Sequence, residues 1–462
     1  MFRRRNYQPM GLKIIVVGCG KVGATLVEQL VKEGHDVTVI DTNISKIEEL
    51  TNFYDIMGVE GNGACYSVQM EAGIENTDLL IAVTGSDELN LLCCTIAKQV
   101  GDCAAIARVR TPDYSQEIGY LREKLGLAMI INPEMEAALQ MARILYLPTA
   151  LEVSPFAHGQ AELIQFKIPE GNILDGITLA QLASKVPDRV LVCAIERDGK
   201  VEIPSGMSEM RAGDVISFVA QRVAVKNFMQ NISVKNTKVK NTMIIGGGKA
   251  AYYLASRLLY MGISVKIIEK DRKRCEELSV LLPKAIIING DGTDAELLKE
   301  EGIETVESFV PLTGMDEENV MLTLHARQLS DAKVITKINR LAFKNVITEL
   351  NLGSVIYPRL ITSESIIAYV RAKRASMDSN LETLYHLFDG QVEALEFSIG
   401  EISKVTNVPL MNLKLKDQVL VAFINRNGKI ILPSGQDSIQ IGDTVMIVTT
   451  HRGFDEIEDI LR

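Results

Sequence analysis

The chain has 462 residues, of which 47% are hydrophobic and 23% charged, and its formal net charge is −10 at pH 7. This length predicts about three to four domains. The acidic balance argues against nucleic acid as a partner, because a polyanion is bound by basic surfaces, and against charge-driven docking on anionic lipid. No apolar run approaches the roughly 20 residues of a membrane-spanning helix, so we expect no direct insertion into a membrane.

The first part of the chain alternates short apolar runs with helical stretches. Strands are predicted at Lys13–Val17, Val37–Ile40, Ile56–Val59, Leu79–Val83, Ala105–Val109 and Ala128–Ile131. Helices are predicted between them at Val22–Lys32 and at about 44–51, 64–72, 87–100 and 115–124. This alternation predicts an α/β fold, a Rossmann-like, doubly wound parallel sheet with helices on both faces. Before it, Met1–Met10 is expected to be a disordered tail, and Met10 is an alternative start.

The character of the chain changes after a helical stretch at Glu134–Leu147. Residues 151–230 predict a small α+β domain, with a strand at Ala161–Ile168 and a hairpin that turns at Arg197-Asp198-Gly199. An Asp-Gly pair favours the positive φ angles of such a turn. The polar stretch Ser233–Asn241 then links this domain to the second half of the chain.

The second half repeats the first. Gly199 recurs 229 positions later as Gly428, and Thr84-Gly85 recurs as Thr313-Gly314. A period of this length is too long for a solenoid, so we predict that a two-domain unit is duplicated. The four expected domains are a sheet domain at 11–132, a connector helix and small domain at 133–232, a second sheet domain at 240–358, and a second connector helix and small domain at 359–462. A duplicated cofactor-binding unit suggests a sensor more than a catalyst.

The motif Gly18-Cys19-Gly20-Lys21-Val22-Gly23 places G-x-G-x-x-G between a predicted strand and a predicted helix. Its glycines permit a tight turn, close approach of a phosphate and close helix packing, and the helix N-terminus offers N–H donors. Asp41 ends the second strand, where a carboxylate accepts hydrogen bonds from both ribose hydroxyls. Because Asp41 should repel a 2′-phosphate, NAD is favoured over NADP. ATP and ADP carry the same ribose as NAD and stay open as ligands.

Four further candidate residues follow or end strands of the first sheet domain. Asn62, within Gly61-Asn62-Gly63, is a candidate contact to adenine, with a plain turn as an equal alternative. Thr84 and Gly85 are candidates for the phosphate side of the site. Arg108 on the fifth strand is expected to supply a charge to a phosphate or across an interface, unless it is a solvated strand end.

The second sheet domain keeps this chemistry with changes. Its fingerprint reads Gly246-Gly247-Gly248-Lys249-Ala250-Ala251, and Glu269 replaces Asp41. Asp291, Thr313 and Lys337 stand in the positions of Asn62, Thr84 and Arg108. Arg272, Lys273 and Arg274 follow Glu269 and either accept an extra phosphate or form a solvated helix start. We expect this second site to bind a nucleotide more weakly, or a different one.

Neither a metal site nor a catalytic site is expected. The seven cysteines and five histidines show no metal-ligand spacing, and buried free thiols are predicted. Hydride transfer needs a substrate held against the nicotinamide and a positioned acid or base, and the small domains carry no obvious constellation of that kind. An NAD-dependent oxidoreductase of unknown substrate is the alternative interpretation.

On these residues the chain resembles the bacterial and archaeal TrkA family of potassium-uptake regulators, which are built from tandem RCK (KTN) units. The resemblance covers about residues 11–460. It is carried by Lys13–Gly23, Asp41, Gly61-Asn62-Gly63, Val83–Asn90 and Ala107–Arg110. The family's cofactor residues map onto Gly18 through Val22, Asp41, Asn62, Thr84, Gly85 and Arg108, and in the second half onto Gly246, Gly248 and Glu269.

The resemblance implies a regulatory subunit rather than an enzyme. Such a subunit is cytoplasmic and peripheral on the inner face of the cell membrane, and it gates an integral-membrane Trk-type potassium channel or transporter. It binds NAD or NADH, with ATP or ADP as further ligands, and assembles as a homotetramer. The small domains are expected to serve oligomer contacts or to bind a second effector.

Overall fold

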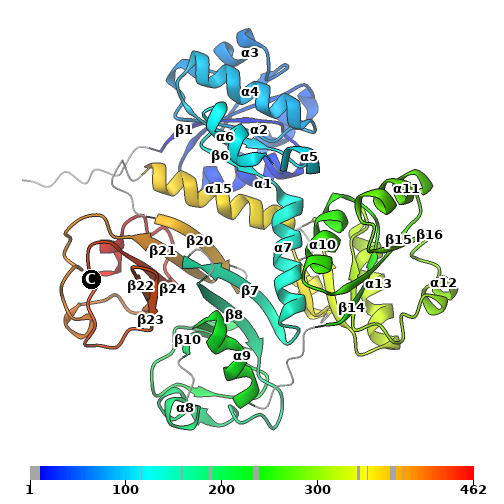
Figure 1. Ribbon diagram of the computed structural model, residues 1–462. Coiled ribbons are helices and arrows are strands. Elements are labelled where there is room, and N and C mark those ends of the chain that lie inside the picture. The colour runs from blue at the N-terminus through cyan, green and yellow to red at the C-terminus, as the bar shows by residue number, and fades with distance from the viewer. Residues whose placement is uncertain are drawn as a thin grey trace, which may run out of the picture. The chain divides into compact units, whose positions relative to one another are not determined.

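The computed structural model describes the chain except for residues 1–10, 116, 158–159, 187–189, 233–238, 341–343, 351, 375–380 and 389. The expected tail Met1–Met10 and most of the linker Ser233–Asn241 therefore lie outside the described residues. The chain divides into two compact units (Figure 1). The first contains the residues up to Glu136 together with Tyr357–Ile367, and the second contains Ala137–Ile356 together with Ala368–Arg462.

The first unit is built on a six-stranded parallel sheet in the order β3-β2-β1-β4-β5-β6. Its strands are β1 (Lys13–Val17), β2 (Asp36–Asp41), β3 (Met57–Glu60), β4 (Leu79–Ala82), β5 (Ala104–Arg108) and β6 (Met129–Ile131). Its helices are α1 (Lys21–Lys32), α2 (Ile44–Phe53), α3 (Tyr66–Glu71), α4 (Asp87–Val100), α5 (Pro112–Ser115) and α6 (Ile118–Lys124), with a short 3-10 helix at Ile74–Asn76. This strand order confirms the predicted Rossmann-like fold.

The apolar, β-branched runs become central strands because both of their faces are covered. Ile14, Ile15, Val16 and Val17 of β1 are all buried, as expected for a parallel strand between two helical layers. The helix predicted over 115–124 is instead divided into α5 and α6. Pro112 begins α5, a position where its fixed φ suits the first helical turn.

The second unit contains an equivalent sheet in the order β16-β15-β14-β17-β18-β19. Its strands are β14 (Asn241–Ile245), β15 (Ser264–Glu269), β16 (Ile286–Asn289), β17 (Ser308–Pro311), β18 (Lys333–Lys337) and β19 (Ser354–Ile356). Its helices are α10 (Lys249–Tyr260), α11 (Arg272–Leu281), α12 (Ala295–Glu300), α13 (Asp316–Leu329) and α14 (Lys344–Glu349). The repeat seen in the sequence is therefore a repeat of the fold.

Each small domain is a five-stranded antiparallel sheet, in the order β11-β10-β13-β8-β7 or β20-β21-β24-β22-β23. The first comprises β7 (Ala150–Phe156), β8 (Ala161–Lys167), β10 (Leu191–Arg197), β11 (Lys200–Glu202) and β13 (Val215–Gln221), with α8 (Leu179–Lys185), α9 (Arg222–Asn231) and the short pair β9 (Ile177–Thr178) and β12 (Glu209–Met210). The second comprises β20 (Leu381–Leu387), β21 (Val392–Ser398), β22 (Val419–Arg426), β23 (Lys429–Ile431) and β24 (Asp443–Thr449), with 3-10 helices at Leu410–Asn412 and Ile457–Ile460.

The small domains explain why several residues recur in both halves of the chain. Arg197 donates from Nε and Nη2 to the two carboxylate oxygens of Asp214, at 2.7 and 2.6 Å. Arg426 makes the same two bonds to Asp443, at 2.8 and 2.7 Å. Both carboxylates are buried, so each pair is a bidentate, charge-assisted contact that ties the turn of a hairpin to the start of the neighbouring strand. These repeated residues are therefore structural.

The two small domains share one hydrophobic core within the second unit. Its buried members from both sheets include Phe156, Leu163, Phe423 and Met446. The ring of Phe156 lies 4.9 Å from that of Tyr385. Hydrogen bonds also join the same two domains, and one of them runs from the backbone N–H of Ala157 to Glu396 at 2.8 Å. The small domains of one chain are thus paired with each other.

The two connector helices are divided between the units. Only the start of α7 (Pro133–Tyr146), as far as Glu136, belongs to the first unit, and the rest belongs to the second. The first half of α15 (Pro358–Arg374) belongs to the first unit, and this helix is drawn in yellow in Figure 1. A segment from the second copy therefore completes the first unit. Among the described residues, no helix is long and apolar enough to cross a membrane.

Candidate functional site

The first glycine-rich loop is tightly packed on one side and open on the other. Gly18 follows β1 with φ of +104°, a conformation that favours glycine. A Cβ atom added at Gly23 would lie 1.9 Å from the carbonyl oxygen of Gly18, whereas one added at Gly20 would meet nothing within 4 Å. The third glycine therefore permits close packing of the helix, and the second leaves space for a ligand to approach the backbone.

The helix that follows this loop has no side-chain cap. Gly20 is the N-cap residue of α1, no side chain among the described residues accepts its first N–H groups, and its first turn contains no acidic residue. Gly248 is the N-cap residue of α10, which likewise has no side-chain cap among the described residues. In contrast, α2 is capped by the side chain of Asn43 and α4 by that of Ser86. Uncapped N–H groups at a helix N-terminus attract anions, so the two fingerprint helices have the donor set that suits a nucleotide phosphate.

The acidic residue at the end of the second strand contacts the glycine-rich loop in both halves. Asp41 accepts the N–H of Cys19 at 2.7 Å and that of Asn43 at 2.9 Å. Glu269 accepts the N–H of Gly247 at 2.6 Å and that of Asp271 at 2.7 Å. Since each carboxylate oxygen has more than one lone pair, both acids retain acceptor capacity for ribose hydroxyls.

The side chains within the first fingerprint differ in accessibility. Cys19 is buried, and this burial together with nearby Asp41 raises the pKa of its thiol to about 12. The thiol therefore stays protonated, and the backbone N–H of Cys19 is donated to Asp41. Val22 is also buried, whereas Lys21 is exposed. Cys65 is exposed, so the prediction of buried thiols is wrong for this residue, which lies at the N-cap position of α3 and not inside the core.

The loop after β4 is held next to Arg108. The guanidinium of Arg108 donates from Nη2 to the carbonyl of Thr84. Its burial and the nearby Arg110 lower the pKa of Arg108 to about 10, so the group is still a cation at neutral pH. A Cβ atom at Gly85 would meet nothing within 4 Å. The structure therefore places a charged group beside an open backbone position at the carboxyl edge of the sheet.

The turn residues after the third strands bond within their own turns. Asn62 accepts the N–H of Ala64 at 3.0 Å. Asp291 accepts the N–H and the hydroxyl of Thr293, at 2.9 and 2.8 Å, and these bonds lower its pKa. The side chain of Asn62 thus acts here as the plain-turn interpretation describes.

In the second half, Thr313 donates its N–H to Asn319 at 2.9 Å, and Lys337 donates from Nζ to the carbonyl of Leu312 at 3.1 Å. Lys249 is the first residue of α10, directly after Gly248. The arrangement of the first site is thus preserved, with a lysine ammonium where Arg108 has a guanidinium.

Two asparagines outside the predicted set of site residues join the loop after the fourth strand to the end of the fifth strand in each sheet domain. Asn90 accepts the N–H and the hydroxyl of Thr84, at 2.8 and 2.7 Å, and donates to the carbonyl of Arg108 at 2.8 Å. Asn319 links Thr313 to Lys337 in the same manner. Both asparagines are fully buried. The sequence does carry a signal for them, because Asn90 recurs as Asn319 at the same period as the threonines.

Replacement of Asn90 by alanine should therefore weaken nucleotide binding through the Thr84 loop. It leaves buried polar groups unpaired, which costs about 1–3 kcal/mol each, and we expect about tenfold weaker NAD binding with lower thermal stability. Calorimetric titration and thermal unfolding measure the two effects. Asn319→Ala is the matched control in the second sheet domain and should leave the first site unchanged. Wild-type NAD affinity in Asn90→Ala would show that the loop does not contribute.

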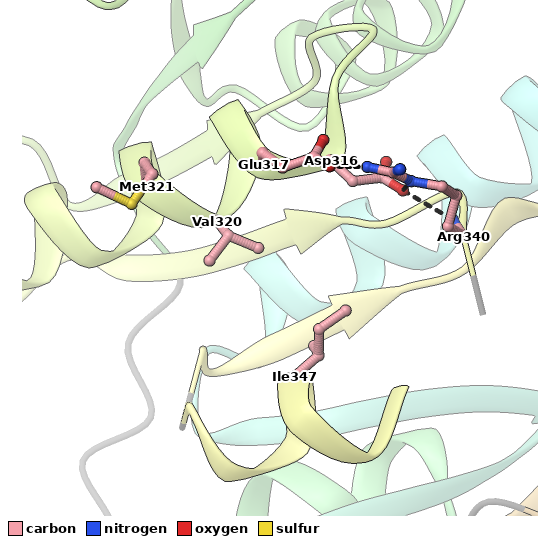
Figure 2. A pocket seen from close by; sticks show the side chains of 6 residues that line it. All are labelled: Asp316, Glu317, Val320, Met321, Arg340 and Ile347. Atoms are coloured by element: carbon pink, nitrogen blue, oxygen red, sulfur yellow. Dashed lines mark hydrogen bonds and ion pairs between the residues drawn. The ribbon is translucent and has the colours of Figure 1, made fainter. Parts of the chain in front are cut away.

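A separate pocket of about 250 Å³ lies on the second sheet domain (Figure 2). It is lined by Asp316, Glu317, Val320, Met321, Arg340 and Ile347. Arg340 is hydrogen-bonded to Glu317, and its Nε lies 3.5 Å from a carboxylate oxygen of Asp316. None of these residues is among the predicted nucleotide contacts of the second sheet domain. Within the described residues, no group of three or more potential ligands is placed to hold a metal ion.

Comparison with protein families agrees with this geometry. The TrkA-N domain matches residues 14–133 and 242–358, which contain the two parallel sheets. The TrkA-C domain matches residues 163–233 and 394–462 in the two small domains. The chain belongs to the TrkA family. Two of its relatives are the Trk system potassium uptake protein TrkA of Haemophilus influenzae and a TrkA homolog of Archaeoglobus fulgidus. Both are 30% identical to it over 98% of this chain, and 99% and 100% of their own lengths are covered.

Solved structures of similar fold extend over both halves of this TrkA-family chain. The GsuK channel bound to NAD has a TM-score of 0.63 at 15% identity, over 97% of this chain and 79% of that one. The GsuK RCK domain has a TM-score of 0.63 at 15% identity, over 96% of this chain and 95% of that one. At this identity the likeness establishes the fold, and the fold with its two fingerprints supports nucleotide binding.

Proposed function

We propose that the chain is a nucleotide-sensing regulatory subunit that gates a Trk-type potassium channel or transporter and catalyses no reaction of its own. The observation that carries this proposal is the first fingerprint. Asp41 contacts the glycine-rich loop at 2.7 Å directly before a helix whose N-terminus has no side-chain cap, in a chain of the TrkA family. The loop, helix and acid together suit the phosphate and ribose of an adenine nucleotide.

NAD or NADH is the ligand that we propose for the first site. The carboxylate of Asp41 suits a ribose with two free hydroxyls and disfavours a 2′-phosphate. ATP and ADP share this ribose and are proposed as ligands of the same site or of the second one. Structures of similar fold support both kinds of ligand, the dinucleotide and the adenine mononucleotide, because GsuK has been described bound to NAD and bound to ADP. The remaining predicted contacts, from Gly18 to Val22 and at Asn62, Thr84, Gly85 and Arg108, are proposed as further contacts of the same nucleotide.

A path from the nucleotide to the connector helix supports a regulatory role for the first site. Arg110 is hydrogen-bonded to the carbonyl of Gly85, and its Nη1 lies 3.9 Å from a carboxylate oxygen of Glu134 in the first turn of α7. A bound phosphate that changes the conformation of the Gly85 loop therefore acts on Arg110, which contacts α7. A ligand shifts a conformational equilibrium only by its different affinity for the two conformations, and this contact is where such a difference would arise.

The second copy differs in sequence at both residues of that contact. Asn339 stands 229 positions after Arg110, and it bonds to Asp316 through its N–H and its side-chain amide. The second connector helix begins with Pro358-Arg359, where the first begins with Pro133-Glu134. The acid that Arg110 contacts is thus replaced by a base. We infer that the first site transmits the nucleotide signal and that the second has a different task.

The assembly belongs to the same proposal. We propose a homotetramer that is cytoplasmic and peripheral on the inner face of the membrane, with an integral-membrane Trk-type subunit as its partner. Within each chain, the domains are proposed at 11–132, 133–232, 240–358 and 359–462. The family match of the sheet domains and of the small domains supports this division.

Reconstitution of the purified chain with a Trk-type membrane subunit in lipid vesicles tests the proposal. Potassium flux should depend on the chain and should change when NAD is replaced by NADH, or ATP by ADP. Flux that is the same with and without the chain would contradict the regulatory role. Oxidation of NADH by the chain alone in the presence of a metabolite would favour an oxidoreductase instead.

A further inference from the structure

Three basic residues follow the ribose-binding acid of the second copy, and the structure separates them. Arg272 extends into solvent with 83% of its side chain exposed, and its Nε lies 3.2 Å from Glu276. Arg274 turns inward with only 25% of its side chain exposed. Its Nε donates a hydrogen bond of 2.7 Å to the carbonyl of Gly247. Arg274 therefore does not belong to a solvated helix start.

The contact of Arg274 falls on the central glycine of the second fingerprint. Gly247 donates its N–H to Glu269 at 2.6 Å and accepts from Arg274 through its carbonyl. The guanidinium and the acid are thus bonded to the two ends of one residue. Nη1 of Arg274 lies 2.8 Å from Glu277, and Nη2 has no hydrogen-bond partner within the described residues.

The first copy is built differently at this position. Lys46 corresponds to Arg274, because it lies 228 positions earlier in the chain. Its side chain is exposed, and its ammonium makes no hydrogen bond within the part of the chain that the structure describes. The two sites therefore share the loop and the acid, while only the second has a planar cation beside them.

We propose that Arg274 forms the base-binding wall of the second nucleotide site, where its guanidinium stacks on the adenine of a nucleotide whose ribose is held by Glu269. This inference rests on the proposed function of the second sheet domain as a nucleotide-binding domain. A ribose joins phosphate at one side to base at the other. With the phosphate at the uncapped N-terminus of α10, the base emerges beside Glu269 near the start of α11, where Arg274 lies. A guanidinium plane stacks on aromatic rings in a way that a lysine ammonium does not.

The same cation also suits a 2′-phosphate on the ribose, but the surroundings disfavour that ligand. One oxygen of Glu269 accepts the N–H of Gly247 and the other accepts that of Asp271, and a carboxylate at this place repels a second anion. A planar, uncharged adenine ring meets no such repulsion. The two ligands should therefore respond differently to Arg274→Lys, which keeps the positive charge and removes the planar guanidinium. Binding of adenine should weaken, whereas binding of a 2′-phosphate should persist.

The test uses the full-length chain carrying Asp41→Asn, which weakens the first site, with and without Arg274→Lys. Binding of ADP and of adenosine 2′,5′-bisphosphate is measured by calorimetry. We expect Arg274→Lys to weaken ADP binding at the second site by about tenfold, in the range of stacking on a cation. Arg272→Lys, on the same helix turn but exposed, is the matched control and should leave ADP affinity unchanged. Thermal unfolding confirms that each variant is folded.

Each outcome supports or overturns the inference. Unchanged ADP affinity in folded Arg274→Lys overturns it. If the 2′,5′-bisphosphate binds more tightly than ADP, and still does so in Arg274→Lys, the inference is also overturned and Arg274 is assigned to a 2′-phosphate. If the Asp41→Asn chain binds no ADP while the wild type binds NAD, the inference fails and the proposed function of the first site stands. If the wild type binds neither NAD nor ADP, the proposed function fails as well.

Discussion

Asp41→Asn is expected to weaken NAD binding at the first site by about 10- to 150-fold, the loss of one hydrogen bond to a charged group, and with it the response of potassium flux to NAD. The carboxylate bonds to the loop through Cys19 and to the start of α2 through Asn43, and it is the proposed acceptor for both ribose hydroxyls. Asparagine keeps one oxygen but loses the charge and half of the acceptor capacity. Hydrogen bonds to a charged group contribute about 1.5–3 kcal/mol each, which gives the expected range. Calorimetric titration with NAD measures the loss.

Asp36→Asn provides the matched control for this prediction. Asp36 begins the same strand, β2, and is exposed at its other end. Because it lies away from the glycine-rich loop, its replacement should leave NAD affinity unchanged. The asparagine at position 41 retains an acceptor for the N–H of Cys19, so the loop should keep its conformation. Equal NAD affinity in Asp41→Asn and wild type would show that the acid does not hold the ribose.

Glu393→Ala is expected to destabilise the chain by about 3–5 kcal/mol, as found when one partner of a buried ion pair is removed. Nη1 and Nη2 of Arg371 lie 3.1 and 3.2 Å from the two carboxylate oxygens of Glu393. Both side chains are almost completely buried, with 5% and 1% exposed. Alanine removes the carboxylate that forms two hydrogen bonds with the buried guanidinium of Arg371. Chemical denaturation, monitored by a probe in the second unit, measures the change.

The double variant Arg371→Met with Glu393→Met is the control, because replacing both charges by apolar groups is often neutral or stabilising. We expect it to recover most of the lost stability. A loss below about 1 kcal/mol in Glu393→Ala, the range typical of surface pairs, would show that water reaches the pair. Full loss in the double variant would mean that packing, rather than the charge, causes the effect.

The same pair predicts a dependence of stability on pH. Burial acts to raise the pKa of Glu393, but hydrogen bonds from His386 and Arg371 and their positive charges outweigh it, so the pKa is lowered. A carboxyl with a lower pKa in the folded state contributes stability above its unfolded value, and this contribution is lost as pH falls through the folded value. Stability should thus decrease below about pH 4, and Glu393→Ala should lack this component.

Much of this molecule follows from local sequence patterns. The helix at Asp87–Val100 begins and ends where the sequence predicts, because Ser86 supplies its cap and apolar residues recur along one face. The positions of Gly18 and Asp41 on the sheet follow from strand length alone, since β1 and β2 run parallel and in register. The tight turns of the two small domains follow from Asp198-Gly199 and Asn427-Gly428, all four of which have positive φ.

Other features depend on contacts between distant parts of the chain. Strand β7 has no clear signal in the sequence, because Glu152, Ser154 and Pro155 interrupt its apolar pattern, and an edge strand tolerates such residues. The inward turn of Arg274 and the outward turn of Arg272 cannot be told apart from neighbouring positions in one basic run. The division of α15 between two units likewise has no local signal, since its sequence is that of an ordinary connector.

The shared core of the two small domains has a consequence for how this protein can diverge. When identical chains pair through such a core, every substitution appears in both partners, and the two halves of the pair stay equivalent. Here Phe156 and Phe423 pack together within a single polypeptide, so pairing needs no encounter between chains and does not depend on protein concentration. One half can then lose a contact or change its ligand while the other keeps its own. The result is a pair of unlike halves in a fixed one-to-one ratio, which no dilution or unequal expression can alter.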